Sequence, residues 1–413
     1  MKTIPLIFVL ILLYTSTIFA QRVSFSPNDS VANAIENQRS FRHMPFQFSF
    51  ITPPLSTNGT DFYKTTNDLS VNTFLGISAG TDLLEVGGFA NINLYYTNGI
   101  QVAGFANVTG IMNSSYESNG VQAAGFANIC GSTYNGIQAS GFANISKTFT
   151  GVQASGFMNV SENATQALQV SGFANTALKA DDVFQVAGFG NIALEGKSKS
   201  QISGFGNMAD DIDGIQAAGF INIAHKVKGV QLSGFINICD SIDGVAISFI
   251  NLVKQNGYRS CEFSFNEWTP IQFTFKMGTK EFYNIYSLSK MPLNWDKYAF
   301  GFGFGHAISM GEQAELDLEI IHHQMFSIST QKVWHNNSAS HKTSLLQFKP
   351  SIKRNIGHGV CLNFGPTLNF NYGYYRNYTA LEIPGDIQPF WNLMNSKQNS
   401  RFWVGFSAGV SLK

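Results

Sequence analysis

The ionisable residues with the most regular spacing lie in the C-terminal part of this 413-residue chain. Glu315, Asp317 and Glu319 alternate with apolar residues in one segment, and Lys349 and Lys353 lie on the polar side of a later one. Alternate residues of a β-strand share a face, so two neighbouring antiparallel strands would bring these acids and lysines together. We interpret them as a structural ion-pair network that fills a barrel lumen. The alternative interpretation is that these residues line a permeation or proton pathway.

Other ligand-type residues lack the spacing of a metal site. His322 and His323 are adjacent, and adjacent residues of a strand point to opposite faces, so both cannot bind one metal. Aspartates between the repeats described below invite a calcium interpretation, but the unit G-G-x-G-x-D is absent. We interpret these aspartates as solvated turn residues: Asp181, Asp182, Asp210, Asp211, Asp213, Asp240 and Asp243.

Motifs that would position a nucleophile or a phosphate are absent from the sequence. It contains no G-x-S-x-G, no H-E-x-x-H and no phosphate-binding glycine loop. We therefore expect no enzymatic activity, no catalytic residues, no metal and no cofactor. Lysine plus arginine equals aspartate plus glutamate at 26 each, which argues against a nucleic-acid partner.

Composition favours β-structure in or near a membrane. Charged residues make up 13% of the chain, about half of the ~25% typical of soluble domains. The 39 glycines and 37 phenylalanines are abundant, as closely stacked β-structure or a membrane β-barrel would require. Cysteines are too few for a disulfide scaffold, and we expect free buried thiols at Cys130, Cys239, Cys261 and Cys361.

The first twenty residues have the pattern of a signal peptide. Lys2 precedes an unbroken apolar run, Ile4–Leu13, and Ala20 lies at a suitable cleavage position. Such a run is too short to span a bilayer as a mature helix. We therefore expect residues 1–20 to be removed, leaving an exported chain that begins at Gln21 and can enter a membrane only as β-structure.

The middle of the chain is a repeat array. The tetrad G-F-x-N recurs ten times between Gly88 and Asn237, mostly every 15 or 16 residues, and Ser248–Asn251 is a degenerate eleventh copy. The fuller unit is G-[VI]-Q-x-[AS]-G-F-x-N-[IV], followed by a variable polar turn. Each unit is either one coil of a β-solenoid or one long strand of an antiparallel barrel. Barrels alternate short and long connections, so the near-constant spacing favours the solenoid.

In a solenoid, equivalent residues of successive coils stack into ladders. We expect phenylalanine to fill the interior, asparagine amides to bond along the axis, and glycine to form tight corners. The predicted ladder comprises Phe89, Asn91, Phe105, Asn107, Phe126, Asn128, Phe142, Asn144, Phe157, Asn159, Phe173, Asn175, Phe189, Asn191, Phe205, Asn207, Phe220, Asn222, Phe235 and Asn237.

Residues from about 260 onward predict an antiparallel barrel. Long runs with strict alternation, such as Tyr298–Gly305 and Phe402–Leu412, match the ~9–11 residues of a tilted transmembrane strand. Short turns at 310–313 and 355–359 alternate with longer polar segments at 329–342 and 375–401, as in outer-membrane barrels. We expect about 8–10 strands, with a barrel-like strand near 45–52 pairing with the last one to close the sheet.

These patterns divide an all-β chain into four parts. They are a signal peptide (1–20), an N-terminal segment (21–85), the repeat array (86–253) and the barrel region (254–413). The repeat resembles those of a family of bacterial surface-repeat proteins, and the flanks resemble Gram-negative outer-membrane barrels. The resemblance implies a place in the outer membrane, with lipid as a partner and a surface ligand or envelope protein as another. We expect a non-enzymatic, barrel-anchored protein; a transport or pore protein with the repeats as plug or vestibule is the alternative.

Overall fold

The computed structural model describes residues 41–112, 118–290, 297–311, 313–327, 343–373 and 401–413. Within these residues the chain forms a solenoid of about 11 coils of roughly 16 residues and a closed eight-stranded antiparallel barrel. It divides into two compact units, one ending at Gly219 and the other beginning at Phe220. The expected signal peptide lies outside the described residues.

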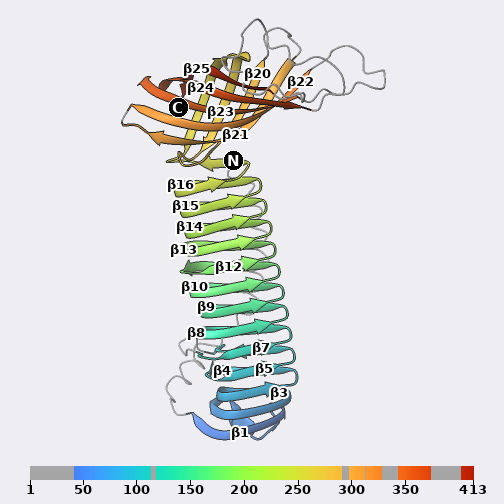
Figure 1. The fold of residues 1–413 in the computed structure, drawn as a ribbon. Coiled ribbons are helices and arrows are strands. Elements are labelled where there is room, and N and C mark those ends of the chain that lie inside the picture. The colour runs from blue at the N-terminus through green and yellow to red at the C-terminus, as the bar shows by residue number, and fades with distance from the viewer. Residues whose placement is uncertain (1–40, 113–117, 291–296, 312, 328–342, 374–400) are drawn as a thin grey trace, which may run out of the picture. The chain divides into compact units, whose positions relative to one another are not determined.

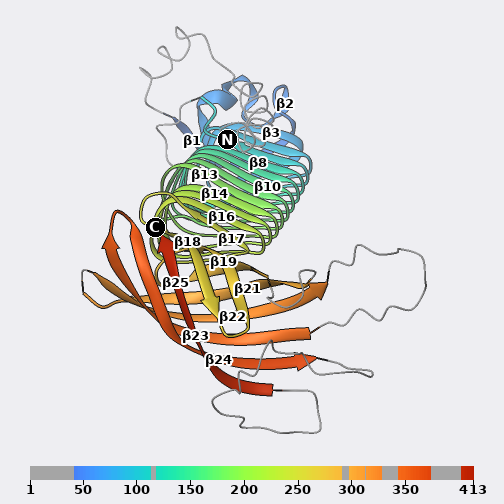
Figure 2. The same ribbon diagram turned by 90° about the horizontal axis from the view of Figure 1, so that it is seen from above.

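Unit 1 consists mainly of parallel strands, and each coil pairs in register with the next (Figures 1 and 2). Asn144 lies beside Asn159, which lies beside Asn175. This parallel pairing confirms the solenoid and rules out the alternative of one long antiparallel strand per repeat. The strands are β1 (Arg42–Ile51), β2 (Leu55–Ser56), β3 (Thr65–Gly87), β4 (Ala90–Thr97), β5 (Ile100–Ala103), β6 (Ala106–Thr109), β7 (Val121–Ala124), β8 (Ala127–Ser140), β9 (Ala143–Ser155), β10 (Met158–Ser171), β11 (Ala174–Asp181), β12 (Phe184–Ala187), β13 (Gly190–Ser203) and β14 (Gly206–Ala218).

The Gly-Phe pair of each repeat forms the sharp corner of the coil. A Cβ atom added to Gly156 would lie 2.1 Å from the carbonyl oxygen of Gly141 in the preceding coil. Only glycine fits this close approach of two backbones. The polar segment on the other side of the coil is extended for most of its length, and bulges such as that between Ala164 and Ala167 absorb its variable length.

The solenoid begins before the first complete repeat. Strand β1 pairs in parallel with β3 from Arg42 to Ile51, and β2 and a 3-10 turn, η1 (Gly59–Lys64), follow it. The expectation that the strand near 45–52 closes the barrel is therefore wrong. Its alternation, with Gln47 and Ser49 buried and the phenylalanines exposed, suits a polar solenoid interior as well as a polar barrel lumen.

Unit 2 contains the last coils and the barrel. Its coil strands are β15 (Ile221–Ser233), β16 (Ile236–Ile247) and β17 (Ile250–Val253). The barrel strands are β18 (Tyr258–Asn266), β19 (Thr269–Gly278), β20 (Tyr283–Lys290), β21 (Lys297–Ser309), β22 (Ala314–Ser327), β23 (Thr343–Gly357), β24 (Val360–Gly373) and β25 (Arg401–Leu412). Each pairs antiparallel with its neighbour, and β25 pairs with β18 to close the ring. Closure removes both sheet edges.

Candidate functional site

The asparagines of the repeat form a continuous hydrogen-bonded ladder inside the coils of unit 1. The Nδ2 of Asn159 donates to Oδ1 of Asn175 (2.8 Å) and to the carbonyl of Val170 (2.8 Å), while its Oδ1 accepts from Asn144 (2.9 Å). The same pattern links Asn91, Asn107, Asn128 and Asn144, and then Asn175, Asn191 and Asn207. Each amide thus has both its donor and its acceptor used in a buried site.

A second ladder, made of glutamines, runs beside the first in the opposite direction. Gln169 Nε2 donates to Gln153 Oε1 in the preceding coil (2.8 Å), whereas each asparagine donates to the following coil. The amide dipoles of the two ladders therefore oppose each other.

The glutamine ladder ends at Glu85, which stands in the glutamine position of its coil. Its carboxylate accepts from Gln101 Nε2 (2.9 Å) and Asn72 Nδ2 (2.9 Å). Burial raises the pKa of Glu85 to about 7, because these hydrogen bonds only partly offset the lost hydration. This group was not singled out from the sequence, although its place in the repeat could have identified it.

The phenylalanines stack as predicted but lie on the outside of the coils. From Phe74 to Phe205, successive rings are nearly parallel with centroids 4.8–4.9 Å apart. Phe157 is nevertheless 38% exposed and Phe105 is 41% exposed. The expectation that phenylalanine fills the interior is wrong. The Gly-Phe corner turns the ring outward, and the interior holds asparagine, glutamine and small residues instead.

In unit 2 the ladders continue onto the barrel. Phe220 and Phe235 stack at 4.9 Å, and Asn222 donates to Asn237 (3.1 Å), which donates to Asn251 (3.0 Å). Asn284 of β20 then accepts from Asn251 (3.4 Å) and donates to the carbonyl of Phe249 (2.8 Å). A barrel side chain thus caps the last coil, whose edge would otherwise expose unpaired polar groups.

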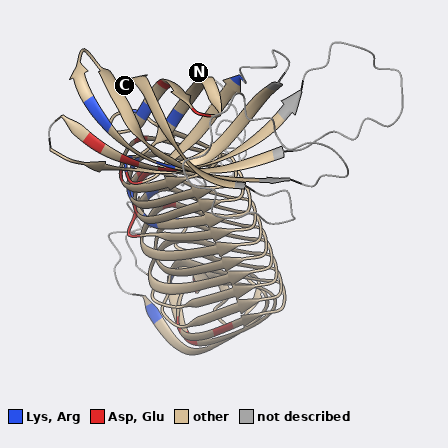
Figure 3. Ribbon diagram, turned by 45° about the horizontal axis from the view of Figure 1, so that its top comes forward, with Lys and Arg blue, Asp and Glu red and all other residues tan. Residues whose placement is uncertain are grey.

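The barrel lumen contains a buried network of carboxylates and lysines. Lys276 Nζ lies 2.7 Å from Glu262 Oε2 and 3.7 Å from Asp317 Oδ2, and it also pairs with Glu319. Lys349 lies 2.5 Å from Glu262 Oε1 and 3.7 Å from Glu319 Oε2. Every one of these side chains is at most 2% exposed. Figure 3 shows charged residues of both signs on the barrel strands.

The five residues predicted to lie in the lumen make different contacts there. The structure brings Glu319 and Lys349 together, as their opposed register requires. Lys353 instead donates to the hydroxyl of Tyr258 (2.8 Å), which donates to Asp317 (3.2 Å). Glu315 lies nearer the end of the barrel, where Lys413 (2.7 Å) and Lys280 (2.9 Å) pair with it.

Sequence reasoning missed two central members of this network. Glu262 lies between Cys261 and Phe263, and Lys276 lies between Phe275 and Met277. Both are single charges on the polar side of an alternating strand, which is the same signal that identified Glu319. Neither residue has a second charge at matching spacing in its own segment, and such spacing is what identifies Glu315, Asp317 and Glu319.

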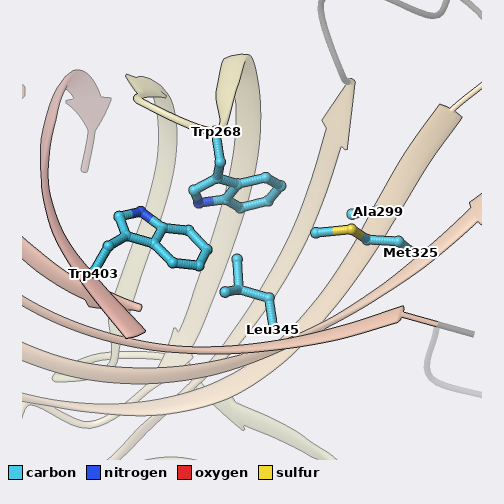
Figure 4. Packing of buried hydrophobic residues seen from close by; sticks show 5 residues of the cluster. All are labelled: Trp268, Ala299, Met325, Leu345 and Trp403. Atoms are coloured by element: carbon cyan, nitrogen blue, oxygen red, sulfur yellow. The ribbon is translucent and has the colours of Figure 1, made fainter. Parts of the chain in front are cut away.

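The other end of the lumen contains a cluster of buried apolar side chains. Trp268, Ala299, Met325, Leu345 and Trp403 form a buried cluster, with side chains that converge from several strands (Figure 4).

The turn between β18 and β19 is tied to the two strands that follow β18 around the ring, β25 and β24, beside this cluster. Glu267 accepts from Trp403 Nε1 (3.0 Å), Asn369 Nδ2 (2.6 Å) and Thr367 Oγ1 (3.1 Å). These contacts hold the turn against β24 and β25.

His322 and His323 point to opposite faces of β22, as their adjacent positions predict. His323 is fully buried, packs edge-on against Trp268 with ring centroids 4.8 Å apart, and lies near Ser287 Oγ (3.4 Å), whereas His322 is partly exposed. In unit 1, His43 lies between Asp68 (3.2 Å from Nε2) and Asp82 (4.0 Å from Nδ1). One ligand atom from each of His43, Asp68 and Asp82 lies within 4.8 Å of the other two, a spacing at which the three could hold a metal ion.

The four cysteines are free thiols, as predicted; Cys130, Cys239 and Cys361 are also buried, whereas Cys261 is only partly buried. Burial raises the pKa of the Cys130 thiol to about 11 and that of Cys239 to about 12. Both are therefore unreactive neutral groups at physiological pH.

No protein family, curated protein or solved structure matches this chain. Among the described residues, no helix has the length and apolar character needed to cross a membrane.

Proposed function

We propose that this chain is a non-enzymatic outer-membrane protein of a Gram-negative bacterium, anchored by the barrel and carrying the coils as a structural or interaction element of the envelope. The observation that carries the proposal is the inverted polarity of the barrel. Phe265, Ile320 and Phe406 are 53–58% exposed on its outside, whereas Lys276 and Glu319 are fully buried inside. Water would make such an arrangement unstable, and lipid would make it favourable. The N-terminal segment with the pattern of a signal peptide supports export.

The connection lengths support a periplasmic location for the last coils. At the barrel end where β18 begins and β25 finishes, the connections contain four, four and two residues. At the opposite end they contain two, six, fifteen and twenty-seven residues. Outer-membrane barrels direct their short turns toward the periplasm. Because β17 enters the barrel at the short-turn end, we infer that β15–β17 lie on the periplasmic side rather than on the cell surface.

The filled lumen favours a role as a membrane anchor over a role as a pore. The ion-pair network fills one level of the lumen, and the Trp268 cluster fills another. We therefore expect the purified chain to give no steady conductance in planar bilayers. A reproducible ion-selective conductance would favour the transport alternative.

The membrane location can be tested by cysteine labelling along β25. In a background with the four native cysteines replaced by serine, single cysteines are placed at Phe406 and Val410, which face outward, and at Ser407 and Ser411, which face inward. A lipid-soluble thiol reagent should label only the first pair in membranes. Equal labelling of both pairs would reject the membrane barrel.

A further inference from the structure

One face of the unit 1 solenoid is apolar, exposed and free of charge. It is formed by the outward residues of the segment [VI]-Q-x-[AS]-G-F, and we call it the apolar face. Between Gly99 and Gly219, the charged residues of the repeats all lie in the variable polar segments instead. Residues of the apolar face that are 38–48% exposed include Phe89, Ile100, Val102, Phe105, Phe126, Ile137, Phe157, Leu168, Val170, Phe184, Val186, Ile202 and Ile215.

The apolar face has a ridge and a groove that run side by side across the coils. The ridge is the stack of phenylalanine rings. The groove, of about 510 Å³, occurs where the outward residue between the glutamine and the corner is alanine instead of valine. It is lined by Val102, Ala103, Ala123, Ala124, Gly125, Ala139, Ser140, Ala154, Ser155 and Val170.

The open apolar area is larger than a monomer normally leaves in water. A phenylalanine side chain has roughly 200 Å² of surface, so the exposed fractions above sum to on the order of 1,000 Å². The largest apolar patch of a typical monomer is about 300–600 Å². A stable interface needs about 800 Å² from each partner. The face therefore offers enough area for one standard interface.

We propose that the apolar face is the interface with a second copy of this chain. Its rows repeat every 4.8–4.9 Å, the spacing of the stacked rings. A partner that packs along several coils must have the same period, which a second copy provides. A two-fold axis would place the ridge of each copy in the groove of the other, giving a dry, interdigitated contact of the kind seen between stacked sheets. The charged segments at the coil edges remain in water. The proposal is independent of the membrane location.

Site-specific photocrosslinking in cells that express the full chain identifies the occupant of the face. Benzoylphenylalanine replaces Phe157 on the ridge, and in a matched control it replaces Tyr134, which is 51% exposed in a polar segment. We expect a product of twice the chain mass from the ridge position only, with the crosslink mapped to the groove of the second copy. Crosslinks to lipid, to residues 21–40 of the same chain or to another protein would each overturn the proposal.

A groove variant tests the same contact without a crosslinker. Ala139→Glu with Ala154→Glu adds two charges to the groove, whereas Tyr134→Glu with Thr165→Glu adds two charges to exposed polar segments of nearby coils. Sedimentation at micromolar concentration should show dimers for the unmodified chain and the second variant. The first variant should weaken association by at least about 100-fold, because buried charges would face apolar rows. An unmodified chain that sediments as a monomer, or two variants that dimerise alike, would contradict the proposal.

Discussion

The coils of unit 1 and the barrel of unit 2 both have polar interiors and apolar outer rows. The buried polar side chains of the two regions, however, find different kinds of partner. In the coils, Asn159 meets asparagines on both sides, and Gln169 donates to another glutamine. In the barrel, Lys276 meets Glu262 and Glu319. One interior uses neutral amides and the other uses opposite charges.

The pairing geometry explains this difference. In a parallel solenoid each residue stacks on its own equivalent, so only a group with both donor and acceptor can form a ladder. A lysine or glutamate in that place would face a like charge. In the barrel, each strand has two neighbours of different sequence, and opposite charges can meet. Glu85 agrees with this rule, because it occupies the end of a ladder, where an acceptor alone suffices.

Removing one partner from the barrel network should have the largest effect. Lys276→Met would leave Glu262 and Glu319 short of positive charge in a fully buried site. Breaking a buried ion pair in this way costs about 3–5 kcal/mol. We expect a loss of that size in urea unfolding of the refolded chain, monitored by tryptophan fluorescence.

The matched control is Lys280→Met, which removes a lysine that is 48% exposed and pairs with Glu315 at the barrel end. An exposed pair contributes about 0–1 kcal/mol. Similar losses for both variants would mean that water reaches the lumen. The ion pairs would then not be the buried counterpart of the amide ladders in the coils.

Breaking the amide ladder should cause the second-largest loss of stability. Asn159→Ala removes the amide that joins Asn144, Asn175 and the carbonyl of Val170. Each lost bond contributes about 1 kcal/mol and leaves a buried partner unsatisfied, so we expect a loss of about 2–4 kcal/mol. Hydrogen exchange across residues 140–180 would locate the loosened coils. Asn163→Ala, in a polar segment of the same strand, should leave the exchange unchanged; if it does not, the ladder is not the cause.

Glu85 makes the stability of unit 1 depend on pH. Its folded pKa of about 7 lies above the ordinary value of 4.5, so the folded state holds a proton that the unfolded chain releases. Unfolding free energy should therefore fall as pH rises from 4.5 to 7, by about 3 kcal/mol in total. Glu85→Gln should abolish this slope, as measured by denaturation at several pH values. The exposed residue Glu162, replaced by glutamine, serves as a control that should keep the slope. A pH dependence that survives Glu85→Gln would show that another group causes it.

The repeat spacing was sufficient to predict parallel coils, and alternation was sufficient to predict the closed barrel. Which side of the coil the phenylalanines occupy was not predictable by counting residues. Strict alternation from Gln153 would put Phe157 inside, but the bend at Gly156 changes the parity and turns the ring outward. Alternation also failed for β1, because Gln47 and Ser49 point inward equally well in a solenoid or a barrel. The partners of a strand depend on contacts distant in sequence.

The lumen network was predictable only in part, for a related reason. Register between adjacent strands paired Glu319 with Lys349 correctly. The contact of Lys349 with Glu262 crosses the ring between strands that are not neighbours. Such contacts depend on the diameter of the closed barrel and the reach of each side chain, which alternation does not specify.

The smallest expected effect is that of Phe157→Ala on the stability of the isolated chain. The ring is 38% exposed and stacks on Phe142 and Phe173 at 4.9 Å. A buried phenylalanine costs about 3–5 kcal/mol to truncate; this partly exposed ring should cost about 1–2 kcal/mol, less than Asn159→Ala. Denaturation must be followed at high dilution, where copies of the chain are separated. A loss as large as that of Asn159→Ala would indicate that the outer ridge, and not the amide interior, holds the coils together.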